Sequence, residues 1–434
     1  MLFKGLAVLL FSLATSYSFC QVDRALIDSW LSYEHKLDPP SADKIISTRD
    51  IDSLSPWLPP GFIDEMKFDS FKMKLQKTKT FKPHISYIEA TTKYQQKVIL
   101  ESDGRLTNYV AGSPFSLNKI HEDRRQAGLM VAWNNIHRWQ YYGYKVEDLT
   151  MAYISAGAKT ELLEPKEGLM GGGKLDRLFS QLYHRVYLNN LAMLPEKNYR
   201  VALKDSETRF FKDYIEFQSP FNVKGTKFVV ERMNDPYADD QVNTYLPTER
   251  RVRRFSAKER ADSFMGSDAT LDDFEGFSGR VLDYKWQYLG AKKIYTVSDM
   301  KQETLIVYGP NSRIPDDHWQ LRDCHIVEVT STWSGHPYRS RILFIDKESF
   351  SVHLSLIFNS DNLLWKTMQT IHAAPKGNSN NIENSVLSWR GQINIDRLSN
   401  RATIVRGRSK TFHPTMKESK IKRVFNVSSL SEGQ

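Results

Sequence analysis

Hydrophobic and polar residues alternate in many short runs between about residues 215 and 395, which is the pattern of half-buried β-strands. The clearest run places Leu282, Tyr284, Trp286 and Tyr288 on one face, with charged or amide side chains between them. Other runs place these pairs on one face: Ile215 and Phe217, Phe228 and Val230, Val327 and Val329, Leu343 and Ile345, Leu354 and Leu356. Such a succession, with turns between the runs, predicts one large, curved antiparallel sheet with a single apolar face.

Helical patterns are concentrated before residue 145. Residues 71–75 alternate as a strand, residues 85–96 predict a helix, and residues 97–109 predict a hairpin that turns at Asp103-Gly104. From about Glu122 to Trp139, apolar residues recur at helical spacing, so we expect a helix that packs one face on the sheet. Together these elements predict an α+β fold.

The first 20 residues have the features of a secretory signal peptide. Lys4 precedes an apolar stretch, and small residues at Ser16 and Ser18 favour cleavage after Ser18 or after Cys20. Lipid attachment to Cys20 would make the chain an outer-membrane lipoprotein, but Phe19 occupies a position where a lipidation signal has a small residue. We therefore predict a soluble periplasmic protein. After this segment no apolar run approaches the ~20 residues that span a bilayer.

Composition divides the remainder of the chain into three parts. Residues 21–66 are polar and proline-rich, and we expect this segment to be largely irregular. Residues 67–411 carry the strand and helix patterns and form the main domain. Residues 412–434 are basic and predict a weakly ordered tail.

An arginine-rich run is followed closely by acidic residues between positions 250 and 275. We predict that arginines of the run pair with these carboxylates and clasp a strand to a short helix. The residues of this structural clasp are Arg251, Arg254, Asp262, Gly266, Asp268 and Asp273. Gly266 permits a sharp turn, and Thr270-Leu-Asp-Asp273 has the form of a capping box. A calcium loop is the alternative, but Asp273 stands where that loop needs glycine.

The sequence contains no recognisable catalytic or metal-binding motif. Its 11 histidines include no His-Glu-x-x-His pair, no Gly-x-Ser-x-Gly elbow occurs, and Cys324 lacks a catalytic signature. The glycines of residues 168–173 lack the ending of a phosphate-binding loop. We therefore predict a protein that is not an enzyme and holds no metal or cofactor.

Charge and cysteine content add few constraints on partners. The net charge is +9, with 60 basic residues mixed among 51 acidic ones, which suits an anionic membrane surface or simple solubility. No basic block or nucleic-acid motif is present, so nucleic acid is not an expected partner. Once Cys20 is removed, Cys324 has no intramolecular partner, and a monomer without disulfides is expected.

Three segments carry a resemblance to a known family. They are Tyr245-Leu-Pro followed by Arg251-Val-Arg253-Arg254 and Asp262-Ser-Phe-Met-Gly-Ser-Asp268, then residues 109–115, and residues 339–366. The chain resembles the periplasmic outer-membrane lipoprotein-sorting superfamily, and more closely a large branch of it catalogued as a domain of unknown function. The turn Asn359-Ser-Asp-Asn362 departs from the charged, glycine-bearing turn of relatives, which leaves the role of that loop open.

The resemblance implies an open half-barrel closed by helices, with an apolar concavity. It suggests a carrier or chaperone for a lipid or other hydrophobic molecule, with a membrane transporter as partner. The expected lining residues are Phe217, Phe228, Val230, Leu282, Tyr284, Trp286, Tyr288, Leu343 and Ile345. The alternatives are an envelope scaffold or sensor without a transported ligand and, third, an envelope hydrolase. A ligand-sized apolar cavity separates a carrier from a scaffold, whereas a hydrolase needs a polar cluster with shifted pKa values in a cleft.

Overall fold

A single large sheet dominates the computed structural model, which describes residue 19 and residues 21–157, 167–194, 199–375, 382–407 and 411–431. Fifteen strands of these residues belong to it. Their order is β1 (Ile45–Ser47), β2 (Lys72–Leu75), β14 (His318–Ser331), β15 (Ser340–Asp346), β16 (Val352–Phe358), β17 (Leu364–Ala373), β18 (Ser388–Asp396), β19 (Arg401–Gly407), β5 (Gly143–Ser155), β6 (Lys174–Tyr187), β7 (Arg209–Ser219), β8 (Lys227–Met233), β9 (Gln241–Leu246) and β10 (Arg251–Phe255), with β11 (Tyr284–Thr296) also pairing with β14.

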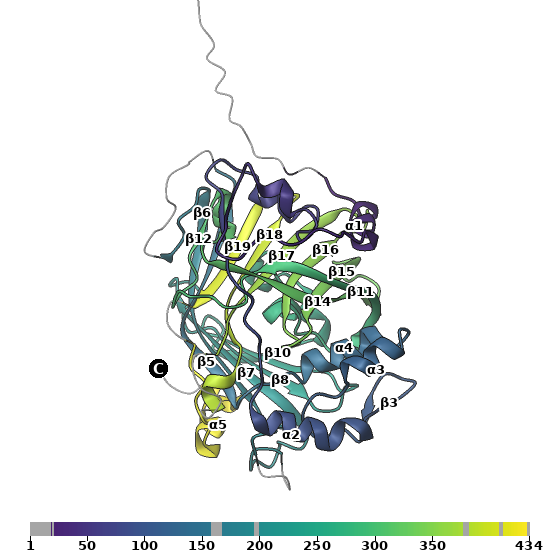
Figure 1. Cartoon of the computed structure of the whole chain (residues 1–434). Coiled ribbons are helices and arrows are strands. Elements are labelled where there is room, and N and C mark those ends of the chain that lie inside the picture. Colours follow the sequence, from purple (N-terminus) through teal and green to yellow (C-terminus); the bar gives the residue numbers. More distant parts are fainter. Residues whose placement is uncertain are drawn as a thin grey trace, which may run out of the picture.

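The sheet is curved and open, as the strand patterns and the resemblance predict (Figure 1). Its pairings are antiparallel except the short parallel contact between β2 and β14. Two hairpins lie apart from it, β3 (Ile99–Leu100) with β4 (Leu106–Thr107) and β12 (Val307–Tyr308) with β13 (Ile314–Pro315). The predicted α+β half-barrel with covering helices is confirmed.

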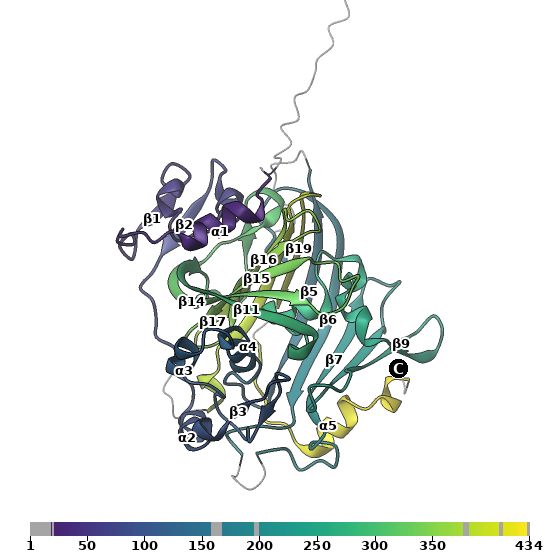
Figure 2. The same ribbon diagram turned by 90° about the vertical axis from the view of Figure 1, so that its right-hand side faces the viewer.

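Five α-helices surround the sheet in the described residues. They are α1 (Arg24–Ser32), α2 (Ile85–Tyr94), α3 (Leu117–Glu122), α4 (Ala127–Ile136) and α5 (Glu418–Val424). The predicted helix at 85–96 and the hairpin at 97–109 are confirmed. In both views α1 lies at one end of the sheet, while α2 and α5 lie at the other (Figures 1 and 2).

The N-terminal segment is more ordered than its composition predicts. Residues 21–66 contain α1, β1 and two 3₁₀ helices, Ile51–Leu54 and Ile63–Met66, instead of an irregular chain. Their apolar side chains share a core with Phe344, Leu356 and Ile371 of the sheet. Enough apolar residues are scattered through this polar segment to cover a sheet face, and those of α1 recur at helical spacing.

The central strands are buried on both faces, not on one as the alternation predicts. Every residue of β15 and of β16 is buried. Ile342 and Phe344 face the core beneath the N-terminal segment, whereas Leu343 and Ile345 face a second core that includes α4. The predicted weakly ordered tail also packs on the body, because Ile421 and Phe425 of the α5 region are buried.

Candidate functional site

Residues 256–283 lie on the concave face of the sheet. Their short 3₁₀ helices are Ala257–Ala261, Phe264–Gly266, Leu271–Gly276 and Val281–Asp283. Side chains of β15 and β19 and of β6 all bind this one segment, so it spans the inside of the curve. The predicted turn is confirmed, since Met265 and Gly266 adopt left-handed φ angles of 53° and 80°.

The turn at residues 264–266, which we call the cover turn, packs apolar side chains against the concave face of the sheet, which we call the hollow. The ring of Phe264 lies 6.2 Å from that of Phe217 and 5.7 Å from that of Phe228. Tyr153 donates a hydrogen bond to the carbonyl of Met265 at 3.0 Å. The inward-facing side chains of the strands from β5 to β9 therefore pack against Phe264 and Met265 of the cover turn.

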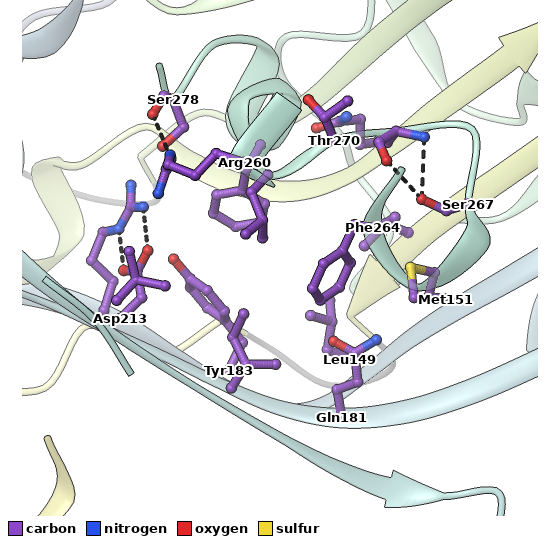
Figure 3. Close-up of a pocket in the computed structure, with 18 residues that line it drawn as sticks. Leu149, Met151, Gln181, Tyr183, Asp213, Arg260, Phe264, Ser267, Thr270 and Ser278 are labelled. Atoms are coloured by element: carbon purple, nitrogen blue, oxygen red, sulfur yellow. Dashed lines mark hydrogen bonds and ion pairs between the residues drawn. The ribbon is translucent and has the colours of Figure 1, made fainter. Parts of the chain in front are cut away.

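A cavity of about 70 Å³ remains beneath this segment (Figure 3). Its apolar lining consists of Leu149, Met151, Ile215, Val230, Phe264, Ala269, Leu271, Phe274 and Val405. The strand residues among them alternate with residues that point away from the hollow, as a pleated strand requires. The structure thus forms an apolar cavity on the face where a half-barrel is expected to have one.

One end of the cavity is charged. Arg185 binds Asp213 through two hydrogen bonds, Nε to Oδ1 at 2.6 Å and Nη2 to Oδ2 at 2.7 Å. Arg260 donates to Asp272 at 2.8 Å and lies 3.2 Å from Asp240. Figure 3 shows Tyr183 extending its hydroxyl towards this end, where Asp213 and Arg260 lie.

The acidic residues of the segment are its anchors to the sheet. Asp268 binds Arg401 of β19 at 2.6 Å. Asp273 accepts a hydrogen bond from Arg341 of β15 at 2.8 Å and another from the backbone N–H of Thr270 at 2.8 Å. The second bond is half of the predicted capping box.

Glu275 is the third anchor and the most deeply networked one. It accepts hydrogen bonds from Arg138, from Arg185 at 3.4 Å and from the Tyr144 hydroxyl at 2.6 Å. Burial alone would raise the pKa of Glu275, but Arg138 and Arg185 outweigh it and hold that pKa below the usual value. A carboxylate that is held ionised in this way is a poor proton donor at neutral pH. Glu275 is therefore suited to holding the segment on the sheet and not to acid catalysis.

The predicted clasp has the right chemistry but the wrong arginines. Arg251 lies on the edge strand β10 and binds Glu249 at 2.8 Å, and Arg254 is exposed. Asp262 is exposed, whereas Asp268 and Asp273 bind arginines of β19 and β15. Sequence proximity suggested the first pairing, but the strand carrying Arg251 and Arg254 leads to the sheet edge and presents its arginines to solvent.

The predicted lining residues fall into two groups. Phe217, Phe228 and Val230 belong to the core under the cover turn, and Val230 lines the cavity itself. The others belong to the core under α4: Leu282, Tyr284, Trp286, Tyr288, Leu343 and Ile345.

The second group is covered by protein. A side chain at Gly128 of α4 would meet the backbone carbonyl of Trp286 at 2.9 Å, so the helix lies directly on β11. The Trp286 indole donates to the carbonyl of Val281 at 2.8 Å. Trp286 therefore packs beneath a helix, away from the cavity that Val230 lines.

The charged residues of the cavity were not predicted from the sequence. Arg185 and Asp213 each interrupt an alternating strand at a position that faces inward, and such an interruption is the one local signal of a buried pair. Arg260 and Tyr183 carry no such signal. No group of three or more metal-binding side chains occurs among the described residues, and none of the described helices is long and apolar enough to cross a membrane.

Two further predictions concern the signal peptide and the cysteines. The signal peptide, residues 1–20, is described only at Phe19, and Cys20 is not described. Cys324 is a buried free cysteine, and burial raises the pKa of its thiol well above the usual value.

Comparison with known proteins identifies a family. The family described as "Protein of unknown function (DUF1329)" matches residues 45–430. No curated protein matches the chain.

Several solved structures are similar to this one. A putative outer membrane lipoprotein-sorting protein domain from Vibrio parahaemolyticus is 16% identical with a TM-score of 0.47, and the match covers 71% of this chain and 100% of that one. A DUF1329 family protein from Desulfovibrio piger is 17% identical with a TM-score of 0.47, covering 71% and 99% of the two chains. A LolA superfamily protein from Nitrosomonas europaea is 12% identical with a TM-score of 0.38, covering 69% and 97%.

Proposed function

The chain belongs to the DUF1329 family of proteins of unknown function, and we propose that it is a periplasmic carrier that shelters a lipid or another hydrophobic molecule in its concave face. The observation that carries this proposal is the apolar cavity that lies between β5–β8 and residues 256–283. Moving an acyl chain through water requires hiding it, at about 0.8 kcal/mol per CH₂ group. An apolar hollow with a separable cover does so without covalent chemistry.

The cover turn is the part of the segment best suited to move. It lies between Arg260, which is held by a buried ion pair with Asp272, and Asp268, a buried carboxylate that binds the half-exposed Arg401. The turn itself contacts the hollow mainly through Phe264 and Met265. Apolar contacts are non-directional and can be exchanged for contacts with an acyl chain. Residues 268–276 would stay in place, because Asp268, Asp273 and Glu275 bind arginines of the sheet. They would form one wall of the enlarged site.

Movement of the cover turn is necessary because the cavity, at about 70 Å³, is far below the roughly 300–1,000 Å³ of small-molecule sites. Exposing two apolar side chains costs up to about 1.5–3 kcal/mol each. At about 0.8 kcal/mol per CH₂ group, about four to eight methylenes of a bound chain offset that cost. A long acyl chain therefore suffices to open the site, and a short one does not.

The small closed volume also favours a second function, that of a scaffold or sensor whose concavity is filled by its own side chains. The two functions make different predictions for the delipidated protein. A carrier binds a fluorescent long-chain acyl probe saturably, and lipid appears in organic extracts of the natively purified protein. A scaffold does neither.

Two variants connect probe binding to the cavity. Val230→Phe fills the space from the strand side and should abolish binding while the protein stays folded, as thermal melts and near-ultraviolet circular dichroism would show. Phe264→Ala removes the main apolar side chain of the cover turn and should raise the affinity for the probe or the rate at which it associates. Absence of binding by the wild type across acyl chains of 8 to 18 carbons would refute the carrier and leave the scaffold.

A further inference from the structure

The cavity wall contains a buried hydroxyl group without a hydrogen-bond partner. Tyr183 is 3% exposed, and its hydroxyl has no partner in normal geometry among the described residues. The neighbouring Tyr144 hydroxyl donates its proton to Glu275 at 2.6 Å, and no hydrogen bond in normal geometry joins the Tyr144 oxygen to the Tyr183 hydroxyl in either direction. A buried polar group without a partner costs about 1–3 kcal/mol, which is unusual enough to require a reason.

A second orphaned polar atom lines the same cavity. Gln392 of β18 is 3% exposed, and its amide oxygen has no partner among the described residues. Its amide nitrogen donates to Asn394 at 2.8 Å, which orients the side chain. The wall thus presents one hydroxyl and one amide oxygen, both uncharged, in otherwise apolar surroundings.

The charged groups of the wall are already paired. Arg185 uses both edges of its guanidinium on Asp213 and Glu275. Arg260 is bound by Asp272 and Asp240 and donates to the Ser278 carbonyl at 3.0 Å. An ionised headgroup entering the cavity would find no free counter-charge there, and burying an unpaired charge is strongly unfavourable.

From this arrangement we infer that the ligand is an uncharged acyl ester, whose carbonyl accepts a hydrogen bond from Tyr183 inside the cavity. The inference rests on the proposed carrier function and specifies its substrate class. Burial raises the pKa of Tyr183 well above 10, so the hydroxyl keeps its proton and remains a donor. The Gln392 oxygen can accept from a ligand hydroxyl, which suits an ester of a polyol.

The test uses one fluorescent long acyl chain in three forms: an ionised carboxylate, its methyl ester, and the plain alkane. The wild type should bind the ester more than about tenfold more tightly than the carboxylate at pH 8. Tyr183→Phe should weaken ester binding by about three- to tenfold and leave alkane binding unchanged. Because the hydroxyl it removes has no partner, this variant should melt at or above the wild-type temperature.

Tyr295→Phe is the matched control. Tyr295 is equally buried, at 3% exposure, but belongs to the core beneath the N-terminal segment. It should change none of the three affinities. Binding in which the carboxylate matches the ester, or in which Tyr183→Phe equals the wild type for the ester, would overturn the ester inference alone. Failure of the wild type to bind any of the three forms would overturn the carrier as well.

Discussion

Replacing Arg341 with methionine should destabilise the protein far more than replacing an arginine of the predicted clasp. The Arg341 and Asp273 side chains are each 1% exposed, and they meet at 2.8 Å. Arg341→Met keeps a long apolar stem in the space between the rings of Phe277 and Tyr338, which lie 5.4 and 5.2 Å from the guanidinium. The variant therefore removes mainly the charge and its hydrogen bond, and leaves the Asp273 carboxylate buried without a cation.

The size of the effect follows from that uncompensated charge. Removing one partner of a buried ion pair typically costs about 3–5 kcal/mol. Asp273 keeps hydrogen bonds from the Tyr338 hydroxyl and the Thr270 N–H, both at 2.8 Å, so we expect a loss near the lower limit, about 3 kcal/mol. The double variant Arg341→Met/Asp273→Asn should recover part of it, since no carboxylate is then stranded.

Arg251→Ala is the matched control. The Arg251 side chain is 62% exposed and pairs with Glu249 on the surface, so its loss should cost less than about 0.5 kcal/mol. Urea unfolding at pH 7, followed by tryptophan fluorescence and far-ultraviolet circular dichroism, measures all three variants. If Arg341→Met lies within 1 kcal/mol of the wild type, or Arg251→Ala costs as much as it does, the assignment of the anchors is wrong.

Three further changes test other buried groups. Burial raises the pKa of Glu65 from 4.5 to about 7, so the stability that its protonated form contributes is present below pH 4.5 and is lost as the pH rises through 7. This pH dependence should amount to about 3 kcal/mol of unfolding free energy in urea titrations, and Glu65→Gln should remove it. Burial lowers the pKa of His413 from 6.5 to about 4, so stability should fall between pH 6.5 and 4, and less in His413→Gln. Gly276→Ala, at φ 89° with its Cβ 2.4 Å from Val352, should lower the unfolding free energy by about 2 kcal/mol or more.

Local features of this protein were predictable from the sequence. The alternation of Tyr284 to Tyr288 identified a strand, since side-chain direction along a strand depends only on the pleat, whereas Leu282 lies in the 3₁₀ helix that precedes it. The turn at Met265-Gly266 and the bond from Thr270 N–H to Asp273 also depend on residues within a few positions of each other. In each case the interacting groups are neighbours in the chain.

The sequence also showed which kinds of residue form the site, but not how they are arranged in space. The acidic segment and the need for arginine partners were visible, but Arg341 and Arg401 approach it only because β15 and β19 lie beside it in the folded sheet. Likewise, the face of β11 that carries Trp286 could equally have lined a cavity or packed under a helix. The position of α4 decided between them.

The pleat and the tight turns were set by steric limits within a few residues, and these limits are the same wherever the segment lies in the fold. Pairing of charges and covering of apolar faces depend on distances through space, which the chain acquires only when strands far apart in sequence associate. For that reason the sequence alone determined the strands of the half-barrel, whereas the tertiary structure decided that residues 256–283 close its hollow and which arginines hold them there.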